Sequence, residues 1–340
     1  MKKLILSLLG GGCLLAAQTG VNAQTLINGA GSSFDYPAFA KWFEAYGKVD
    51  PNVRFNYQSI GSGAGQKQLL NQTVDFGASD APMTDASMSN APAKILHIPV
   101  VAGGVAIIYN LKGDPKLKLD SDVIASIYLG NITKWNDPKI TALNPGVELP
   151  DLAIVPVHRT EGSGTTFIFT DFLSSISPEW AKGPGKGTAI SWPTGIGGKG
   201  NDGVAGAVKQ VEGGLGYVEL AYAKKTSMQT ALVKNKDGKF VEPSAKGATA
   251  AAAAVAASLP ANSDFRVSIV NAAGPESYPI SSFTWMMIYA KQSDPAKGKE
   301  IVDFYKWAMD NGDKMAEDLY YAPLPQSMKV KTLARAAEIK

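Results

Sequence analysis

The sequence predicts an α/β protein of two domains with mainly parallel sheets. Short apolar runs with the alternation of strands are separated by stretches with helical patterning, which is the order of βαβ units. The run 53–59 is followed by a glycine turn and a helical stretch from Gln66. The run 153–157 is likewise followed by a glycine turn and a helical stretch over 165–173. Because parallel strands need such crossover helices, the alternation indicates parallel sheets.

The amino terminus has the features of a cleaved secretory signal peptide. Lys2 and Lys3 precede an apolar run over 4–17, and small residues end at Ala23, where we expect the cut. The apolar run is too short to span a bilayer comfortably. About 317 residues then remain, which is enough for two domains of roughly 100 to 200 residues each.

The sole cysteine, Cys13, lies inside this signal segment. A lipoprotein anchor at Cys13 is an alternative, but lipoprotein sites usually carry Leu three residues before the cysteine, where this chain has Gly10. Without the segment no cysteine remains, so neither disulfides nor thiol chemistry contribute. Losing Lys2 and Lys3 lowers the formal net charge from +3 to +1, which does not suggest nucleic acid or a membrane surface as a partner. We expect a soluble protein in the periplasm.

An apolar stretch over 95–110 is expected to connect the two domains. Pro99 and the glycine pair at 103–104 interrupt it, which predicts two extended segments joined by a crossover. We place the interdomain hinge there. The other predicted elements of the second half are strands over 265–270 and 283–289, a helix over the alanine-rich run 248–257 and a mostly helical tail from Gly298.

Three turns rich in glycine and serine are the most informative feature of the sequence. Each precedes a predicted helix, whose first turn presents unpaired backbone N–H groups and the positive end of the helix dipole. Glycine lets the backbone approach a ligand closely, and serine and threonine hydroxyls add donors. If the turns converge, they form a cage of donors suited to a small oxyanion. The turns are GAGSSF at 29–34, GSGAG at 61–65 and GSGTT at 162–166.

Each turn alone has an ordinary explanation, because serine caps helices and glycine makes turns. Three of them together, with Arg159 just before the third, favour a binding site. Pro37 fits a helix start after the first turn. No glycine loop carries the Lys and Ser or Thr of a nucleotide-hydrolysing P-loop. Gly195, Gly197 and Gly200 match a dinucleotide-binding pattern, but no clear strand precedes them.

Five segments are specific enough to compare with known families. They are VDFGASDAP at 74–82, IYLG at 127–130, GSGT at 162–165, GGKGNDG at 197–203 and GYVE at 216–219. In this order they closely resemble the phosphate-binding receptors of bacterial phosphate ABC transporters, the PstS type. The resemblance covers nearly the whole mature chain, and several segments in order are more specific than any single motif.

The resemblance implies a type II periplasmic-binding-protein fold, in which two α/β lobes joined by crossover strands close over one phosphate. We expect lobe I at residues 24–98 and 276–340 and lobe II at 99–275. We also expect a monomer without cofactor or metal, which delivers inorganic phosphate to the transmembrane permease subunits of a phosphate ABC transporter. The phosphate-binding residues that the motifs imply are Ser33, Phe34 through its backbone N–H, Ser62, Asp80, Arg159, Ser163, Gly164 and Thr165, with Glu161 supporting Arg159.

Three residues depart from the family pattern. Ser33 stands where Thr is usual, Glu161 where Asp is usual and His158 where Arg is usual. Ser33 keeps a hydroxyl, and Glu161 can still pair with Arg159 through a longer side chain. Because His158 removes a fixed positive charge beside the site, the departures bear on affinity and not on the class of ligand.

Asp80 gives a physical reason for anion selectivity. A buried carboxylate can face an anion only if the anion carries a proton to donate, as phosphate does near neutral pH. Sulfate is fully ionised and would leave Asp80 facing lone pairs, at a cost of several kcal/mol, whereas arsenate has the same protonation pattern as phosphate. Without the resemblance, Asp80 could instead be an acidic cap for the helix after Pro82.

Two other classes of function compete with binding. A secreted phosphatase or serine esterase could use one of the serines with His158 or His97. The chain has only two histidines, no GxSxG elbow after a hydrophobic strand and no His and Asp at metal-ligand spacing. An adhesion or interaction protein could use the same fold without the cage. We expect a binding protein and not an enzyme, with His97 as a hydrogen-bonded histidine near the hinge.

Overall fold

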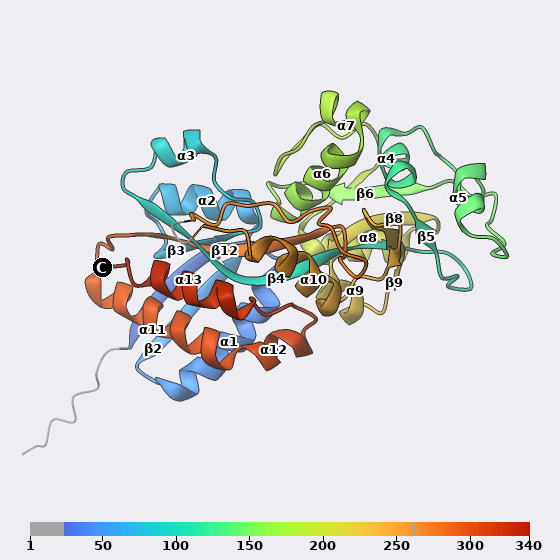
Figure 1. Cartoon of the computed structure of the whole chain (residues 1–340). Helices are drawn as coiled ribbons and strands as arrows, with labels where there is room; N and C mark the ends of the chain where they lie inside the picture. The colour runs from blue at the N-terminus through green and yellow to red at the C-terminus, as the bar shows by residue number, and fades with distance from the viewer. Residues whose placement is uncertain (1–23, 261–262) are drawn as a thin grey trace, which may run out of the picture.

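A long strand, β4 (Ile95–Tyr109), runs through both halves of the molecule and organises its fold (Figure 1). All 15 residues of β4 are buried. Its first part pairs antiparallel with β12 (Ser281–Tyr289), and its last part, from Val105, pairs antiparallel with β8 (Gly214–Glu219). The two lobes on either side of Val105 therefore share one strand.

The computed structural model describes residues 24–260 and 263–340. The predicted signal peptide at 1–23, its cut after Ala23 and the cysteine Cys13 lie outside these residues. Within the described ranges, no helix is both long and apolar enough to cross a membrane.

The prediction of two extended segments over 95–110 was wrong, because β4 continues through both interruptions. The glycine pair at 103–104 stays in the strand and leaves room for aromatic rings, since a Cβ on Gly103 would lie 2.7 Å from the ring of Phe34. Pro99 lies at an irregularity of the ladder between β4 and β12, where a residue without an N–H is tolerated. β4 still carries the chain from one lobe to the other, as a crossover strand does.

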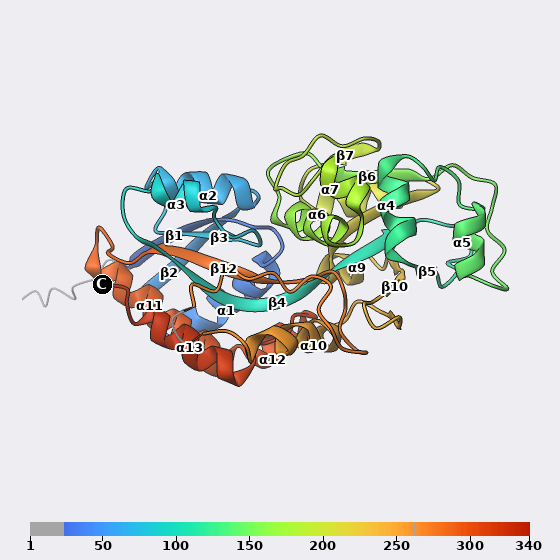
Figure 2. The same ribbon diagram turned by 45° about the horizontal axis from the view of Figure 1, so that its top comes forward.

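The first lobe contains three parallel strands, which β12 and β4 extend in antiparallel fashion. Its strands are β1 (Thr25–Gly31), β2 (Val53–Ser59) and β3 (Phe76–Ser79), in the order β2-β1-β3-β12-β4. Helices cover both faces of this sheet, with α2 and α3 on one face and the others below it in Figures 1 and 2. The helices are α1 (Tyr36–Val49), α2 (Ser62–Leu70), α3 (Asp85–Ser89), α11 (Pro295–Asn311), α12 (Asp313–Asp318) and α13 (Gln326–Ala336).

The second lobe continues the sheet as β4-β8-β6-β7, with β6 (Val155–Arg159) parallel to β7 (Ile196–Gly198) and to β8. The predicted parallel pairing is therefore found in the outer part of each lobe, and the central pairs are antiparallel. The helices are α4 (Ser121–Leu129), α5 (Pro138–Leu143), α6 (Gly164–Ile176), α7 (Pro178–Lys182), α8 (Gly200–Gln210) and α9 (Leu220–Lys225). Helix α10 (Ala245–Ala256) packs against β4 and β12 and lies near α12 (Figure 2). The short strands are β5 (Lys118–Leu119), β9 (Gln229–Thr230), β10 (Leu232–Lys234) and β11 (Phe240–Val241).

The predicted strand over 265–270 was wrong, because this segment is irregular chain. Phe265 has a left-handed backbone (φ 59°), and its carbonyl accepts a hydrogen bond from Trp285 Nε1 (3.0 Å). The apolar residues of the segment, such as Phe265 and Ile269, are buried by side-chain packing. Apolar composition alone did not distinguish this burial from strand pairing.

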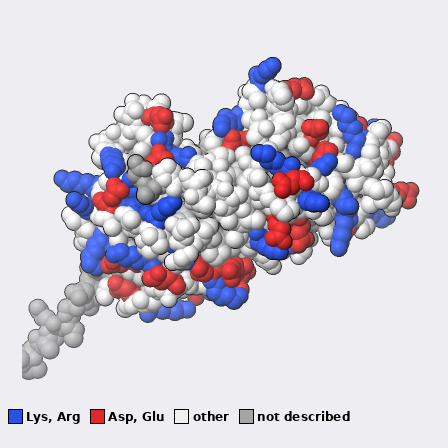
Figure 3. Space-filling model, viewed as in Figure 1, with Lys and Arg blue, Asp and Glu red and all other residues white. Residues whose placement is uncertain are grey.

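The surface between the lobes is hollowed. Figure 3 shows a notch at the top of the view between the two lobes, and it shows basic and acidic side chains interspersed over this face. The mixture agrees with the small net charge of the chain. Each of the three glycine and serine turns lies at or just after the end of a strand, which is β1, β2 or β6.

Candidate functional site

The three turns meet between the lobes. They lead into α1, α2 and α6, so two come from lobe I and one from lobe II. The N–H of Gly63 donates to the carbonyl of Gly162 (2.9 Å), which joins the second turn to the third. A Cβ on Gly164 would lie 2.4 Å from both Asp80 Oδ2 and Ser62 Oγ. Only glycine permits this approach, so the backbone of the third turn lies directly against the carboxylate of lobe I.

The carbonyl groups of the first turn are held by phenols from both lobes. Three successive carbonyls each accept a hydrogen bond from a tyrosine hydroxyl. This arrangement fixes the turn from behind, and the tyrosine on α9 does so across the interlobe boundary. The pairs are Tyr57 with the carbonyl of Ser32 (2.8 Å), Tyr222 with that of Ser33 (2.6 Å) and Tyr321 with that of Phe34 (2.5 Å).

Asp80 is a buried carboxylate surrounded by hydroxyl donors. It is 1% exposed, and Ser32 Oγ lies 2.6 and 2.8 Å from its two oxygens. Thr284 Oγ1 lies 3.0 Å from Oδ1, and Ser62 Oγ lies 3.4 Å from Oδ2. Burial raises the pKa of Asp80 to about 6, although these hydroxyls and the charge of Arg159 oppose the increase. Asp80 is therefore mostly ionised at neutral pH and becomes protonated as the pH falls through about 6.

This pKa predicts a pH-dependent difference in stability between wild type and Asp80→Asn. Because the pKa of Asp80 is higher in the folded protein, the folded state binds the proton more tightly than the unfolded state does. The stability that this proton contributes is fully present below the ordinary pKa of 3.8 and is lost as the pH rises through about 6. The amide does not titrate. With phosphate removed, we expect the free energy of unfolding of the variant, relative to wild type, to increase by about 2 kcal/mol between about pH 4 and pH 7. Urea denaturation across this range measures it, and a difference independent of pH would contradict the assignment.

Arg159 is a buried cation that contacts both lobes. Its side chain is 1% exposed and forms an ion pair with Glu161, including a hydrogen bond from Nε to Oε1 (2.9 Å). Nη1 donates to Thr165 Oγ1 (3.1 Å), and Nη2 donates to Ser33 Oγ (3.3 Å). Burial alone would raise the pKa of Glu161, but hydrogen bonding to Arg159 and its charge lower it below the usual value. The guanidinium is thereby oriented towards the first turn.

Ser163 and Phe34 have local partners in addition to their place at the site. Ser163 Oγ accepts the N–H of Thr166 (3.1 Å) and caps α6, which leaves its own proton to donate. The N–H of Phe34 donates to Ser32 Oγ (2.8 Å), and the ring of Phe34 packs against Tyr321. All the predicted site residues lie within this interlobe cluster, although the N–H of Phe34 already has an acceptor.

Asn201 also lies in the interlobe cluster, and the sequence did not predict it there. It is fully buried in the first turn of α8, and its Nδ2 donates to Ser33 Oγ (3.0 Å) and Thr165 Oγ1 (3.3 Å). Its Oδ1 accepts the N–H of Glu219 (3.0 Å), which fixes the direction of the amide. Its place in the GGKGNDG segment was a signal, but helix capping also explained an asparagine there. Ser32 and Thr284, which donate to Asp80 in addition to Ser62, were also not predicted.

The two histidines have structural partners. The ring of His158 stacks on Trp192 with centroids 4.8 Å apart, and its Nδ1 lies 3.1 Å from the carbonyl of Arg159. Burial lowers the pKa of His158, so it adds no positive charge at neutral pH. His97 Nε2 accepts the N–H of Met83 (3.0 Å), and burial lowers the pKa of His97 to about 4. The prediction of a hydrogen-bonded His97 is confirmed.

Neither histidine is arranged for hydrolysis. In the part of the chain that the structure describes, neither ring forms a hydrogen bond with a serine hydroxyl. The same residues contain no group of three or more His, Cys, Asp or Glu that could hold a metal ion. The arrangement offers donors and one acceptor for an anion.

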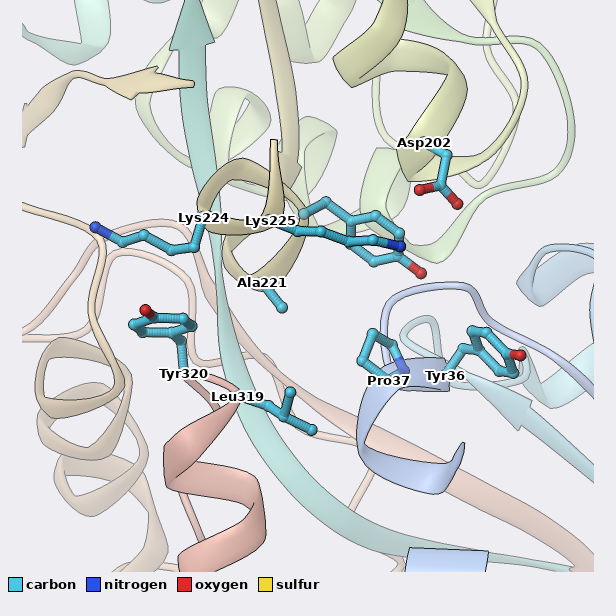
Figure 4. Close-up of a pocket in the computed structure, with 9 residues that line it drawn as sticks. Tyr36, Pro37, Asp202, Ala221, Lys224, Lys225, Leu319 and Tyr320 are labelled. Carbon is cyan, nitrogen blue, oxygen red and sulfur yellow. The ribbon is translucent and has the colours of Figure 1, made fainter. Parts of the chain in front are cut away.

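Two cavities open beside the first turn. One of about 210 Å³ reaches Ser33 and Glu161 from the surface. The other, of about 400 Å³, lies between the lobes, with Tyr36 and Pro37 of α1 facing α9 across it (Figure 4). Lys224 at its rim lies over the ring of Tyr320 at 5.7 Å, which is a further contact between the elements of the two lobes.

Two lobes joined by the shared strand β4, with a polar cluster between them that is built from both, define a two-lobed solute-binding protein. A family model described as "PBP superfamily domain" matches residues 16–311. The phosphate-binding protein PstS of Pasteurella multocida is 44% identical over 315 residues, which cover 92% of this chain and 90% of that protein. The protein of the same name from Xylella fastidiosa is 43% identical over 304 residues, which cover 89% of this chain and 82% of that protein.

Solved structures show the same fold. A periplasmic phosphate-binding protein, PfluDING, bound with phosphate, has a TM-score of 0.71 at 23% identity, covering 91% of this chain and 93% of its own. A phosphate-binding protein from Stenotrophomonas maltophilia has a TM-score of 0.71 at 21% identity, and the match covers 92% of this chain and 94% of that protein. The chain belongs to the PBP superfamily and, within it, to the family of the phosphate-binding proteins PstS. It is a solute-binding protein and not an enzyme.

Proposed function

We propose that this protein binds inorganic phosphate outside the cytoplasmic membrane and delivers it to the transmembrane subunits of an ABC phosphate importer. The observation that carries the proposal is the interlobe cluster, in which hydroxyl, guanidinium and amide donors from both lobes surround one buried carboxylate. The names of the PstS relatives support the choice of anion. A tetrahedral oxyanion with a proton matches many donors and a single acceptor.

Each proposed ligand has a distinct role. Arg159 neutralises the anion and donates in a planar geometry, and Glu161 orients it. Asp80 accepts the proton of phosphate. The remaining donors are the hydroxyls of Ser33, Ser62, Ser163 and Thr165 and the backbone N–H of Gly164 at a helix start. The N–H of Phe34, which donates to Ser32 Oγ in this structure, would also have to turn to the anion to serve as a donor.

Exclusion of sulfate follows from the acceptor role of Asp80. Sulfate has no proton at neutral pH, so its oxygens would face the carboxylate with lone pairs on both sides. An unpaired buried charge costs several kcal/mol, which would reduce sulfate affinity by at least a thousandfold. Arsenate carries the same protons as phosphate and would compete with it.

Phosphate would stabilise the closed arrangement of the lobes, because its ligands come from both. Ser33, Ser62 and Asp80 belong to the first lobe, and Arg159 and Thr165 to the second. The proposed first lobe contains residues 24–98 and 276–340, and the proposed second lobe contains residues 99–275. The chain then passes from one lobe to the other within β4 and returns just before β12. A receptor that closes only around its ligand lets a permease distinguish the loaded form.

Tyr222→Phe tests this closure. The phenol reaches the carbonyl of Ser33 across the lobe boundary (2.6 Å), so its loss leaves that carbonyl unpaired in the closed form only. We expect phosphate affinity to fall about tenfold, from the roughly 1 to 3 kcal/mol cost of an unsatisfied buried group. Calorimetric titration measures the affinity.

Tyr57→Phe is the matched control, because Tyr57 holds the adjacent carbonyl from within the first lobe. It should lower the free energy of unfolding of the phosphate-free protein more than Tyr222→Phe does. If Tyr222→Phe instead destabilises the phosphate-free protein and leaves affinity unaltered, the interlobe role is refuted.

The proposed location is the periplasm, after cleavage near Ala23, and the proposed form is a monomer. Equilibrium dialysis of the phosphate-stripped mature protein with radiolabelled phosphate tests binding. Excess arsenate should displace the label and excess sulfate should not. Delivery is tested with the cognate permease in membrane vesicles, where loaded receptor should stimulate ATP hydrolysis more than stripped receptor. Absence of dialysis binding would refute the proposed ligand, and equal stimulation by both forms would refute delivery.

A further inference from the structure

Asp35 is a second buried carboxyl beside the site, and none of the roles above uses it. It precedes α1 but does not cap that helix with its side chain. Asp35 is 1% exposed; its Oδ2 lies 2.7 Å from Thr284 Oγ1 and its Oδ1 lies 3.3 Å from the hydroxyl of Tyr57. Thr284 on β12 therefore stands between Asp35 and Asp80.

The contacts of Thr284 require a proton that its hydroxyl cannot supply. Its Oγ1 is within hydrogen-bond distance of Asp35 (2.7 Å) and of Asp80 (3.0 Å). Each of these oxygen pairs needs one proton between its two oxygens, and a hydroxyl has one. The second proton must belong to a carboxylic acid, so one of the two aspartates is neutral.

The other partners of the two groups decide which aspartate holds the proton. Asp80 accepts from Ser32 and Ser62 and is stabilised by the charge of Arg159. Among the described residues, Asp35 has, besides Thr284 and its own backbone N–H, the phenol of Tyr57, whose oxygen lies closer to the carbonyl of Ser32 (2.8 Å) than to Asp35 (3.3 Å). The environment therefore favours charge on Asp80 and a proton on Asp35.

The charges around the site point the same way. Four carboxyl groups, on Asp35, Asp80, Glu161 and Glu219, stand near one guanidinium, Arg159. If all were ionised, the net charge would be −3 at a site proposed for an anion. Glu219 is fully buried, and its Oε1 has no hydrogen-bond partner among the described residues. Burial raises the pKa of Asp35 and of Glu219 well above the usual values, and for Asp35 the charge of Asp80 adds to the increase.

The groups that face Asp35 from neighbouring elements are also acids. None of them supplies a positive charge to stabilise ionised Asp35. Burial raises the pKa of all of them, so the phenols remain neutral at neutral pH. These groups are Asp80 after β3, Tyr57 on β2, Tyr222 on α9 and Tyr321 after α12.

We infer that Asp35 is a neutral carboxylic acid whose proton is donated to Thr284, and that Thr284 in turn donates to Asp80 and keeps it an ionised acceptor. Asp35 is thus a positioning residue that acts through Thr284. The consequence for anion selectivity rests on the proposed phosphate binding, whereas the protonation state of Asp35 is independent of it.

Infrared difference spectroscopy tests the protonation state directly. Spectra of the phosphate-stripped protein at pH 7 should lose a protonated carboxylic acid band on Asp35→Asn, an isosteric and neutral change. Asp80→Asn, which removes the other member of the pair, should retain that band. Asp310→Asn, at an exposed position on α11, controls for loss of an ordinary carboxylate. Buried Glu219 should contribute protonated-acid absorbance in both variants. A decrease of this absorbance in Asp80→Asn, or no decrease in Asp35→Asn, would overturn the inference whether or not phosphate binds.

Thr284 variants test the connection to Asp80. Thr284→Val removes the hydroxyl at nearly constant volume, so the preference for phosphate over sulfate should fall at least tenfold. Thr284→Ser should restore the preference, because it restores the donor. Thermal unfolding establishes that both variants fold. If the valine variant is as selective as wild type, Thr284 does not act on Asp80, and if wild type binds no phosphate, the proposed function fails while the infrared result still decides the state of Asp35.

Discussion

Replacing Arg159 with glutamine should reduce phosphate affinity by two to three orders of magnitude. Arg159 is the cation that contacts both the first turn and the third, through Ser33 and Thr165. Its loss leaves Glu161 and Asp80 without a positive partner in a buried site. Removing one member of a buried ion pair costs about 3 to 5 kcal/mol, and each 1.4 kcal/mol corresponds to a tenfold change in affinity. His158 cannot compensate, because burial lowers its pKa and keeps it neutral.

Calorimetric titration of the stripped Arg159→Gln variant measures this effect. Arg54→Gln is the matched control, because Arg54 is an exposed residue of β2 and the same charge is removed far from the cluster. Affinity in the control should stay within about threefold of wild type, since exposed charges contribute little. A folded Arg159→Gln protein that binds phosphate as tightly as the control would contradict the proposed role.

Replacing Asp80 with asparagine should convert a phosphate-selective site into one that accepts sulfate. The amide removes the buried negative charge and can donate a hydrogen bond to an oxyanion without protons. We expect sulfate affinity to rise at least a hundredfold and phosphate affinity to fall about tenfold, because the acceptor for its proton is weakened. Competition of sulfate with labelled phosphate measures both changes.

Asp202→Asn separates this mechanism from simple electrostatic attraction. Asp202 is exposed at the rim of both cavities beside the first turn, so its loss removes the same charge from the cleft without touching the cluster. It should raise the affinity for both anions by a similar small factor. If Asp202→Asn and Asp80→Asn alter the sulfate-to-phosphate ratio equally, selectivity does not come from proton matching.

Local features of the site could be predicted from the sequence because they depend on neighbouring residues. The glycine and serine residues of the turns at 29–34, 61–65 and 162–166 predict helix starts, and all three turns lead into helices. Arg159 was singled out because it lies just before one of them. Parallel pairing in each lobe followed from the alternation of strands and helices.

Features that depend on distant contacts could not be predicted. Thr284 reaches Asp80 from a strand 204 residues away, and Tyr321 reaches Phe34 across 287 residues. An ordinary threonine or tyrosine in an apolar run gives no signal of such a partner. The glycine pair at 103–104 was taken for a break because glycine permits turns, whereas here it gives space to the ring of Phe34 within a continuous strand.

The most direct test of the central claim is calorimetric titration of the phosphate-stripped wild-type protein with phosphate and, separately, with sulfate at neutral pH. The cluster of donors around one ionised carboxylate predicts tight binding of one phosphate per chain and no measurable heat with sulfate. Absence of phosphate binding, or binding of both anions with similar affinity, would contradict the claim that this site selects an oxyanion by the proton it carries.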